Sequence, residues 1–189
     1  MSKRDRPLGQ PQLRVIGGDW RGRKLSFPSK GSLRPTTDRV RETLFNWLAP
    51  MVVEAQCLDL CAGSGALGIE ALSRGAQRCD FVDTDQQAID AIEKNLRSLS
   101  ATERATLRTC RADTVLNGNV QWDIVFVDPR AQTTEILEII GIRKIKYVIC
   151  DDFLNSGQTA AIQQAGYTLH NLNNISKAQG GQDHLRTMV

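Results

Sequence analysis

A glycine-rich segment between two apolar runs holds the residues best suited to bind a cofactor. Gly63, Gly65 and Gly68 have the spacing Gly-x-Gly-x-x-Gly, and Asp83 follows Gly63 by twenty residues. This combination is typical of a dinucleotide site, because glycines let the backbone approach a ligand closely and an acidic side chain accepts hydrogen bonds from ribose hydroxyls. A nicotinamide-dependent oxidoreductase is therefore one interpretation of the segment.

Asp59, at the end of the apolar run before the glycines, favours a different cofactor. A carboxylate at this place would repel a pyrophosphate and attract a cofactor with a cationic amino-acid end, such as S-adenosylmethionine. We expect Asp83 to hold the two ribose hydroxyls and Asp113 to accept a hydrogen bond from the adenine amino group. The predicted cofactor-binding residues are Asp59, Cys61, Gly63, Ser64, Gly65, Asp83 and Asp113. No metal site is predicted.

Asp128 and Pro129 follow another apolar run and have acceptors suited to an amine substrate. The Asp128 carboxylate and the Pro129 carbonyl oxygen could hold the two N–H hydrogens of an exocyclic amine on a base. The nitrogen lone pair would then point at the sulfonium methyl group, and catalysis would consist mainly in positioning an in-line displacement. An Asp-Pro that merely ends a strand is the alternative interpretation.

The elements that must position these residues alternate between strands and helices. We predict strands at 57–60, 80–83, 106–111, 123–128 and 146–150, helices at 66–73, 86–99, 134–140 and 156–164, and extended segments at 167–172 and 184–189. This order is typical of an α/β, Rossmann-like fold with a mostly parallel twisted sheet and helices on both faces. In such folds ligands bind beyond the carboxyl ends of the strands.

The first fifty residues have a different pattern. After a flexible start (residues 1–12), two short extended pieces at 13–27 surround a glycine-rich turn, which predicts a loose β-hairpin. A helix follows, with apolar residues at Val40, Leu44 and Leu48, and we expect it to end before Pro50. The predicted organisation is a basic hairpin and helix at 13–50 and a cofactor-binding domain at 51–189.

The charge of the chain is concentrated near its start. The 189 residues have a net charge of +3, but residues 1–45 contain eleven Lys or Arg against four Asp or Glu, and the rest contains thirteen against seventeen. A basic segment on a slightly acidic body is the pattern of an arm that binds polyanions, although charge runs are more often only solvated surface. Hydrophobic residues make up 41%, so the chain can bury a core.

Other features exclude several classes of protein. No apolar stretch reaches the length of about 20 residues that a membrane span needs, and the start lacks the apolar core of a secretory signal. The five cysteines include no Cys-x-x-Cys pair and are expected to be buried thiols in a reducing cytoplasm. We expect a cytoplasmic protein that acts as a monomer.

Three segments resemble the RsmD-type methyltransferases, which methylate a guanine N2 in 16S ribosomal RNA. They are residues 14–25 (RVIGGDWRGRKL), 34–48 (RPTTDRVRETLFNWL) and 59–74 (DLCAGSGALGIEALSR), the last with Cys61 where the family usually has an aromatic. The resemblance implies a class I methyltransferase fold, S-adenosylmethionine as cofactor, and the small ribosomal subunit or its precursor as partner. It also implies that the N-terminal hairpin contacts RNA.

Charge and resemblance together predict which residues contact RNA. The predicted phosphate-binding residues are Arg21, Arg23, Lys24, Arg34, Arg39 and Arg41. Trp20, between glycines and arginines, is a candidate for contact with RNA as well.

The sequence departs from the family after the fourth predicted strand. The family pattern there is Asp-Pro-Pro followed by an aromatic, whereas this chain has Asp128, Pro129, Arg130 and Ala131. The missing ring would stack on the flipped base, which is worth roughly 1–3 kcal/mol for other stacked bases. The departure leaves a second interpretation open: an RNA-binding or ribosome-assembly protein on the same fold, with impaired catalysis.

Overall fold

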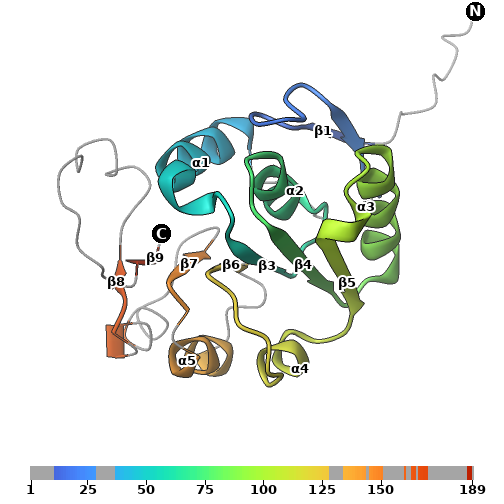
Figure 1. The fold of residues 1–189 in the computed structure, drawn as a ribbon. Helices are drawn as coiled ribbons and strands as arrows, with labels where there is room; N and C mark the ends of the chain where they lie inside the picture. The colour runs from blue at the N-terminus through green and yellow to red at the C-terminus, as the bar shows by residue number, and fades with distance from the viewer. Residues whose placement is uncertain are drawn as a thin grey trace, which may run out of the picture.

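The computed structural model describes residues 11–28, 37–127, 134–143, 145–150, 160, 163–164, 166–169 and 187–188. Within these ranges a parallel sheet lies between two layers of helices, and a two-stranded hairpin lies outside one layer (Figure 1). The prediction of a Rossmann-like α/β fold is confirmed. None of the described helices is long and apolar enough to cross a membrane.

The main sheet has the strand order β5-β4-β3-β6-β7-β9-β8. Its strands are β3 (Gln56–Leu60), β4 (Arg78–Asp83), β5 (Ala105–Thr109), β6 (Ile124–Val127), β7 (Tyr147–Cys150), β8 (Thr168–Leu169) and β9 (Thr187–Met188), and every pairing among them is parallel. The order reverses between β3 and β6, because β4 and β5 continue on one side of β3 and β6 lies on its other side. This reversal is where ligands bind in open α/β sheets.

Two helical layers cover the sheet. Helices α1 (Asp38–Val52), α2 (Ala66–Ser73) and α3 (Gln86–Ser98) lie on one face, and α4 (Ala112–Leu116) and α5 (Thr134–Ile142) lie on the other (Figure 1). A short 3-10 helix, η1 (Thr102–Arg104), leads into β5. Strand residues alternate between the layers: Ile124 and Phe126 belong to the core under α2, and Val125 and Val127 to the core under α5.

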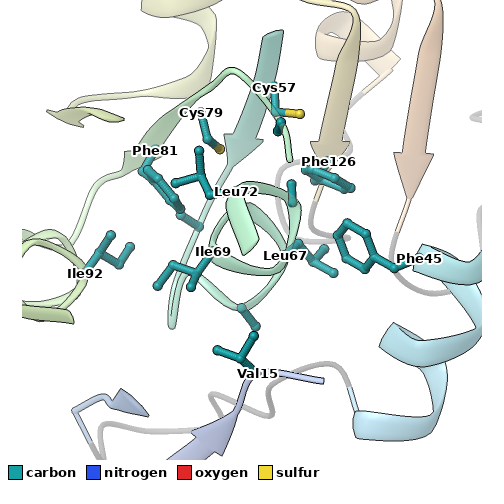
Figure 2. Close-up of a cluster of buried hydrophobic side chains, with 14 of the residues drawn as sticks. Val15, Phe45, Cys57, Leu67, Ile69, Leu72, Cys79, Phe81, Ile92 and Phe126 are labelled. Carbon is teal, nitrogen blue, oxygen red and sulfur yellow. The ribbon is translucent and has the colours of Figure 1, made fainter. Parts of the chain in front are cut away.

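The N-terminal hairpin shares the core formed by the sheet and the layer of α1, α2 and α3. Its strands are β1 (Gln12–Arg14) and β2 (Lys24–Ser26), which pair antiparallel. Figure 2 shows Val15 of the hairpin, Phe45 of α1 and Phe126 of β6 packed around α2, and all three are buried. The hairpin and α1 are therefore packed into the same core as the sheet.

Helix α1 corrects one prediction. The helix was expected to end before Pro50, but it continues to Val52 with Pro50 inside its last turn. A proline costs one backbone hydrogen bond to the fourth residue before it. Here the continued turn buries Val52 in the core, and that burial offsets the lost bond.

The predicted helix at 156–164 and the last two extended segments are only partly described. Residues 160, 163 and 164 are helical, and β8 and β9 lie within the two extended segments. Of the flexible start predicted at residues 1–12, residues 1–10 lie outside the described part, whereas Gln12 is already the first residue of β1.

Candidate cofactor-binding site

The glycine turn joins the carboxyl end of β3 to the start of α2 by a sharply bent backbone. Cys61, Gly63 and Gly65 have φ values of 66°, 53° and 72°, in the left-handed region. Two features favour glycine at position 65. Its φ is left-handed, and a Cβ at this position would lie only 2.9 Å from a side-chain carbon of Ile92. Cys61 adopts the same region at a cost of about 1–2 kcal/mol. Strained backbone at a non-glycine residue is typical of ligand-binding sites.

Asp59 caps helix α2 from inside the sheet. Its side chain is buried, with the residue 4% exposed, and Oδ2 accepts a hydrogen bond of 2.9 Å from the backbone N–H of Gly68. The N-cap residue of α2 is Gly65, which has no side chain to cap the helix. In dinucleotide-binding folds the positive end of this helix receives a pyrophosphate. Here a carboxylate already occupies one of its amides, so the site is a poor one for phosphate.

Asp83, at the end of β4, is fixed by two backbone amides. Oδ2 accepts from the Gly63 N–H at 2.8 Å, and Oδ1 accepts from the Asp85 N–H at 2.9 Å. The half-buried carboxylate is thus tied to the glycine turn and held in one orientation. Since each carboxylate oxygen can accept more than one hydrogen bond, Asp83 can still receive two hydroxyl groups.

Asp113 lies in the first turn of α4, beyond the end of β5. The segment between β5 and α4 lies beside Asp83, because Cys110 donates its backbone N–H to the Asp83 carbonyl oxygen at 3.0 Å. The Arg111 side chain pairs with the carboxylate, with Nη2 3.0 Å from Oδ2, and this hydrogen bond lowers the pKa of Asp113 below its ordinary value. Asp113 is therefore an ionised acceptor at neutral pH. Helix α4 itself was missing from the predicted elements.

The predicted cofactor residues thus gather at the carboxyl ends of three neighbouring strands. Ser64 is buried within the turn, and Cys61 is half-buried and packs against the core under α5. Among the described residues, no group of three or more His, Cys, Asp or Glu side chains could hold a metal ion.

The predicted reacting residues, Asp128 and Pro129, lie outside the described residues, as does the departure at Arg130 and Ala131. The residue before them, Val127, is paired with Leu60 in the parallel register of β6 and β3. The chain therefore leaves β6 beside the start of the glycine turn.

The basic residues fall into two groups. Arg21, Arg23 and Lys24 on the hairpin and Arg39 on α1 are exposed, as expected for residues that contact RNA. Arg23 also donates to the Ser98 carbonyl oxygen at 3.0 Å. Arg34 lies outside the described residues.

Arg41 is a correction. Its side chain is 1% exposed, and Nη2 donates to the Arg14 carbonyl oxygen at 3.0 Å and to Asp38 Oδ1 at 2.6 Å. Because these bonds and its burial hold the guanidinium inside the protein, Arg41 is not part of the surface open to RNA. It joins the hairpin to α1 instead. Trp20 is only partly buried, and the Arg104 guanidinium lies 5.7 Å from its ring centroid.

Sequence reasoning missed Glu70 and Ser73, which hold the hairpin on α2. The backbone N–H groups of Ile16 and Gly17 donate to the two Glu70 oxygens, each at 2.8 Å, and the Trp20 N–H donates to Ser73 Oγ at 3.0 Å. The signal that could have found Glu70 is a charged residue inside an otherwise apolar helix, since a buried charge requires partners.

Comparisons with known proteins agree on one family. The model of the family described as Conserved hypothetical protein 95 matches residues 13–188. The chain is 44% identical over 152 residues to Ribosomal RNA small subunit methyltransferase D of Escherichia coli, covering 80% of this chain and 77% of that protein. It is 42% identical over 133 residues to the protein of the same name from Haemophilus influenzae, covering 68% and 69%.

A solved structure is similar as well. A putative methyltransferase, yhhF, from Escherichia coli has a TM-score of 0.65 and 47% sequence identity, and the match covers 71% of this chain and 75% of that one.

The reversed sheet order, the glycine turn and the carboxylates at successive strand ends define a class I methyltransferase with S-adenosylmethionine as its cofactor. The carboxylates of the site fit that cofactor. They offer acceptors for its hydroxyl and amino groups, and Asp59 supplies a buried negative charge where a dinucleotide site would bind phosphate. Within this class, the chain belongs to the RsmD family, the family of the ribosomal RNA small subunit methyltransferase D proteins.

Proposed function

We propose that this protein transfers a methyl group from S-adenosylmethionine to the exocyclic N2 amine of a guanine in small-subunit (16S) ribosomal RNA. The observation that carries the proposal is the Asp59 carboxylate bonded to the Gly68 amide at the start of α2. It disfavours a pyrophosphate at that helix end and favours a cationic cofactor. The relatives named ribosomal RNA small subunit methyltransferase D support RNA as the acceptor.

Each cofactor-binding residue has a separate task in this proposal. Asp83 receives the ribose hydroxyls, Asp113 receives the adenine amino group, and the turn at Cys61, Gly63, Ser64 and Gly65 lies against the rest of the cofactor. When bound, S-adenosylmethionine supplies an electrophilic methyl group on a sulfonium centre. Asp59 and Asp83 need not move to bind the cofactor, because backbone amides already hold their carboxylates in place.

Asp128 and Pro129 orient the acceptor amine. Their carboxylate and carbonyl oxygens accept hydrogen bonds from its two N–H groups, which leaves the nitrogen lone pair aimed at the methyl group. The amine nitrogen held in this way would take up the methyl group and release one proton to solvent, and the donor would be left as a neutral thioether. The pairing of Val127 with Leu60 supports this task, since it starts the Asp128 segment beside the cofactor turn.

The exposed basic residues suit a large, structured RNA. Arg21 and Arg23 lie in the hairpin turn, which docks on the C-terminal ends of α2 and α3, while the cofactor turn is at the N-terminal end of α2. Eight helical residues span roughly 12 Å. An RNA bound at both places must therefore reach over at least the length of α2, which is more than a single nucleotide spans. The small subunit or its precursor, in the cytoplasm, is such a substrate.

A methylation assay tests the proposal. Small subunits from a strain that lacks the modification are incubated with the protein and radiolabelled S-adenosylmethionine, and the RNA is digested to nucleosides. We expect label in N2-methylguanosine. Subunits that are bound without any methylation would instead favour the impaired, RNA-binding interpretation of Arg130 and Ala131. Label in another nucleoside would refute the guanine-N2 chemistry.

A further inference from the structure

Glu70 is a fully buried carboxylate in the middle of α2, and both of its oxygens bind the hairpin. Oε2 accepts from the Ile16 N–H and Oε1 from the Gly17 N–H, each at 2.8 Å, and the residue is 0% exposed. A carboxylate that receives two successive backbone amides holds that backbone in one orientation. The sequence separation between these partners is more than fifty residues, so the bonds fix one segment on another.

Two arginines balance the charge of Glu70. Arg74 Nε lies 2.8 Å from Oε1, and the buried Arg41 has Nη1 3.9 Å from Oε2. Arg41 Nε and Nη1 have no hydrogen-bond partner among the described residues, so its charge depends on Glu70 and Asp38. Since Arg41 also binds the Arg14 carbonyl oxygen, Glu70 lies at the junction of the hairpin, α1 and α2.

Ser73, one turn further along α2, completes the attachment. Its Oγ donates to the Gly17 carbonyl oxygen at 2.6 Å, and its own carbonyl oxygen accepts from the Asp19 N–H at 2.8 Å. Gly18 passes so close that a Cβ would lie 1.8 Å from the Ser73 oxygen, and its φ is +72°. Only glycine fits this contact.

Helix α2 therefore joins two sites. Its N-terminal end continues from the cofactor turn at Gly65, and its C-terminal half binds the hairpin through Glu70 and Ser73. All eight residues of α2 are buried, and Figure 2 shows the helix enclosed between the sheet and Val15 of the hairpin. A short helix packed on all sides is a rigid spacer between its two ends.

We infer that Glu70 is a positioning residue for the RNA substrate: it fixes the basic hairpin at a set place relative to the methyl donor. This inference rests on the proposed function. Glu70 touches neither the predicted cofactor residues nor the reacting segment within the described contacts, so its effect must pass through the hairpin. The basic residues that it positions are Arg21, Arg23 and Lys24.

The variant Glu70→Gln tests the inference, with Asp80→Asn as a matched control. Glutamine keeps the size of the side chain but removes its charge and presents an N–H donor to one of the two hairpin amides. Asp80 is also a buried carboxylate, 4% exposed, but it accepts from Trp122 Nε1 at 3.1 Å in the other half of the core, away from the hairpin. The control therefore separates loss of a buried charge from loss of the hairpin contact.

Three measurements are made on each variant. Hydrogen exchange at the amides of Ile16 and Gly17 should become about tenfold faster or more in Glu70→Gln only, because local protection follows the local contacts. The KM for small subunits should rise about tenfold in Glu70→Gln only, since misplaced substrate contacts lose binding energy. The dissociation constant for S-adenosylmethionine should stay within about twofold of the wild-type value in both variants.

Several results would overturn the inference. Unchanged exchange at Ile16 and Gly17 in Glu70→Gln would show that the carboxylate does not hold the hairpin. Faster exchange with an unchanged KM for subunits would show that the hairpin position does not matter for RNA. A wild-type protein that neither binds nor methylates subunits would refute the proposed function, and with it the RNA part of the inference, whatever the exchange data show.

If Glu70→Gln does not fold, Ser73→Ala replaces it. This change removes one donor and one acceptor without leaving a buried charge. We expect the same direction of change at the Trp20 amide and in the KM for subunits, by a smaller factor of about three to ten. A subunit KM equal to that of the wild type, together with faster exchange at Trp20, would contradict the inference.

Discussion

Each carboxylate of the candidate cofactor site accepts a hydrogen bond from a nearby backbone amide. Asp83 receives the amides of Gly63 and Asp85, Asp59 receives that of Gly68, and Asp113 receives that of Thr114. These bonds orient the charges before any ligand arrives, so binding does not have to order the side chains. The same carboxylates also hold the loops that present them, so the site and the local fold share residues.

At the residue scale, Asp83→Asn should weaken the binding of S-adenosylmethionine by about ten- to a hundredfold. The amide oxygen can still accept from the Gly63 N–H, but the NH2 group then faces the Asp85 N–H, and the charge-assisted hydrogen bonds to the ribose, worth about 1.5–3 kcal/mol, are lost. Titration calorimetry measures the change, and circular dichroism checks the fold. An affinity equal to that of the wild type would remove Asp83 from the site.

Cysteine reactivity gives a second test at this scale. Burial raises the pKa of the Cys57 and Cys79 thiols, and both should resist iodoacetamide at pH 8 in the folded protein. The half-buried Cys61 and Cys110 should react first. Saturating S-adenosylhomocysteine should slow labelling of Cys61 more than that of Cys110, as mass spectrometry of peptides can show. Equal labelling of Cys61 with and without the ligand would exclude it from the site.

At the element scale, the amino ends of β3, β6 and β7 are joined by one carboxylate. Asp123, just before β6, accepts from the Gln56 N–H at 2.9 Å and pairs with Lys146 Nζ at 2.7 Å. Burial works to raise the pKa of Asp123, but the Gln56 amide and Lys146 outweigh it, so the pKa lies below its ordinary value. The hydrogen bond with Asp123 raises the pKa of Lys146 in turn.

The pH dependence of stability follows from these two directions. A carboxyl whose pKa is lowered by folding stabilises the protein above its unfolded pKa of about 4, and loses that effect as the pH falls through the folded pKa. Lys146 contributes below its unfolded pKa of about 10.4, and loses this as the pH rises further. The free energy of unfolding should therefore differ between wild type and Asp123→Asn by about 1 kcal/mol from pH 5 to 9.

Urea unfolding at a series of pH values measures this difference. The difference should begin to shrink as the pH falls below about 4, where the carboxyl of the unfolded chain takes up its proton, and should be lost below the lowered pKa of the folded carboxyl. A difference that stays constant down to pH 2 would contradict the assigned role of the Asp123 charge.

Strand and helix order could be predicted from the sequence because apolar runs and helical periods alternate clearly after residue 55. The carboxylates at the strand ends followed from the same order, since parallel strands bring their carboxyl ends to one edge. The end of α1 and the burial of Arg41 could not be predicted, because both depend on tertiary contacts. Val52 is buried by continuing α1 past Pro50, and Arg41 resembles any exposed basic residue until its partners Asp38 and Glu70 are known.

At the scale of the whole molecule, the exposed charge of the hairpin and the carboxylates of the cofactor site lie at opposite ends of α2. The hairpin presents Arg21, Arg23 and Lys24 at the surface, whereas Asp59 is buried in the sheet. In the proposed function, this separation allows the hairpin to bind a polyanion while the candidate cofactor site disfavours phosphate. The family match over residues 13–188 includes both parts.

Charge reversal on the hairpin tests this division. The double variant Arg21→Glu and Lys24→Glu should weaken RNA binding about tenfold or more and reduce the slope of log K against log salt by roughly 1 to 2, because each phosphate contact contributes about 0.7–0.9. Affinity for S-adenosylmethionine should not change. Filter binding at several salt concentrations measures the slope. The same affinity and slope as the wild type would show that the hairpin does not hold RNA.

The central claim is that the site formed by Asp59, Asp83 and the glycine turn binds a cationic methyl donor and not a dinucleotide. Titration calorimetry of the wild-type protein with S-adenosylmethionine, S-adenosylhomocysteine and NAD tests it without involving the segment at Asp128. We predict one-to-one binding of the first two compounds and no heat of binding with NAD. Binding of NAD in place of S-adenosylmethionine, or no binding of any of the three, would contradict the claim.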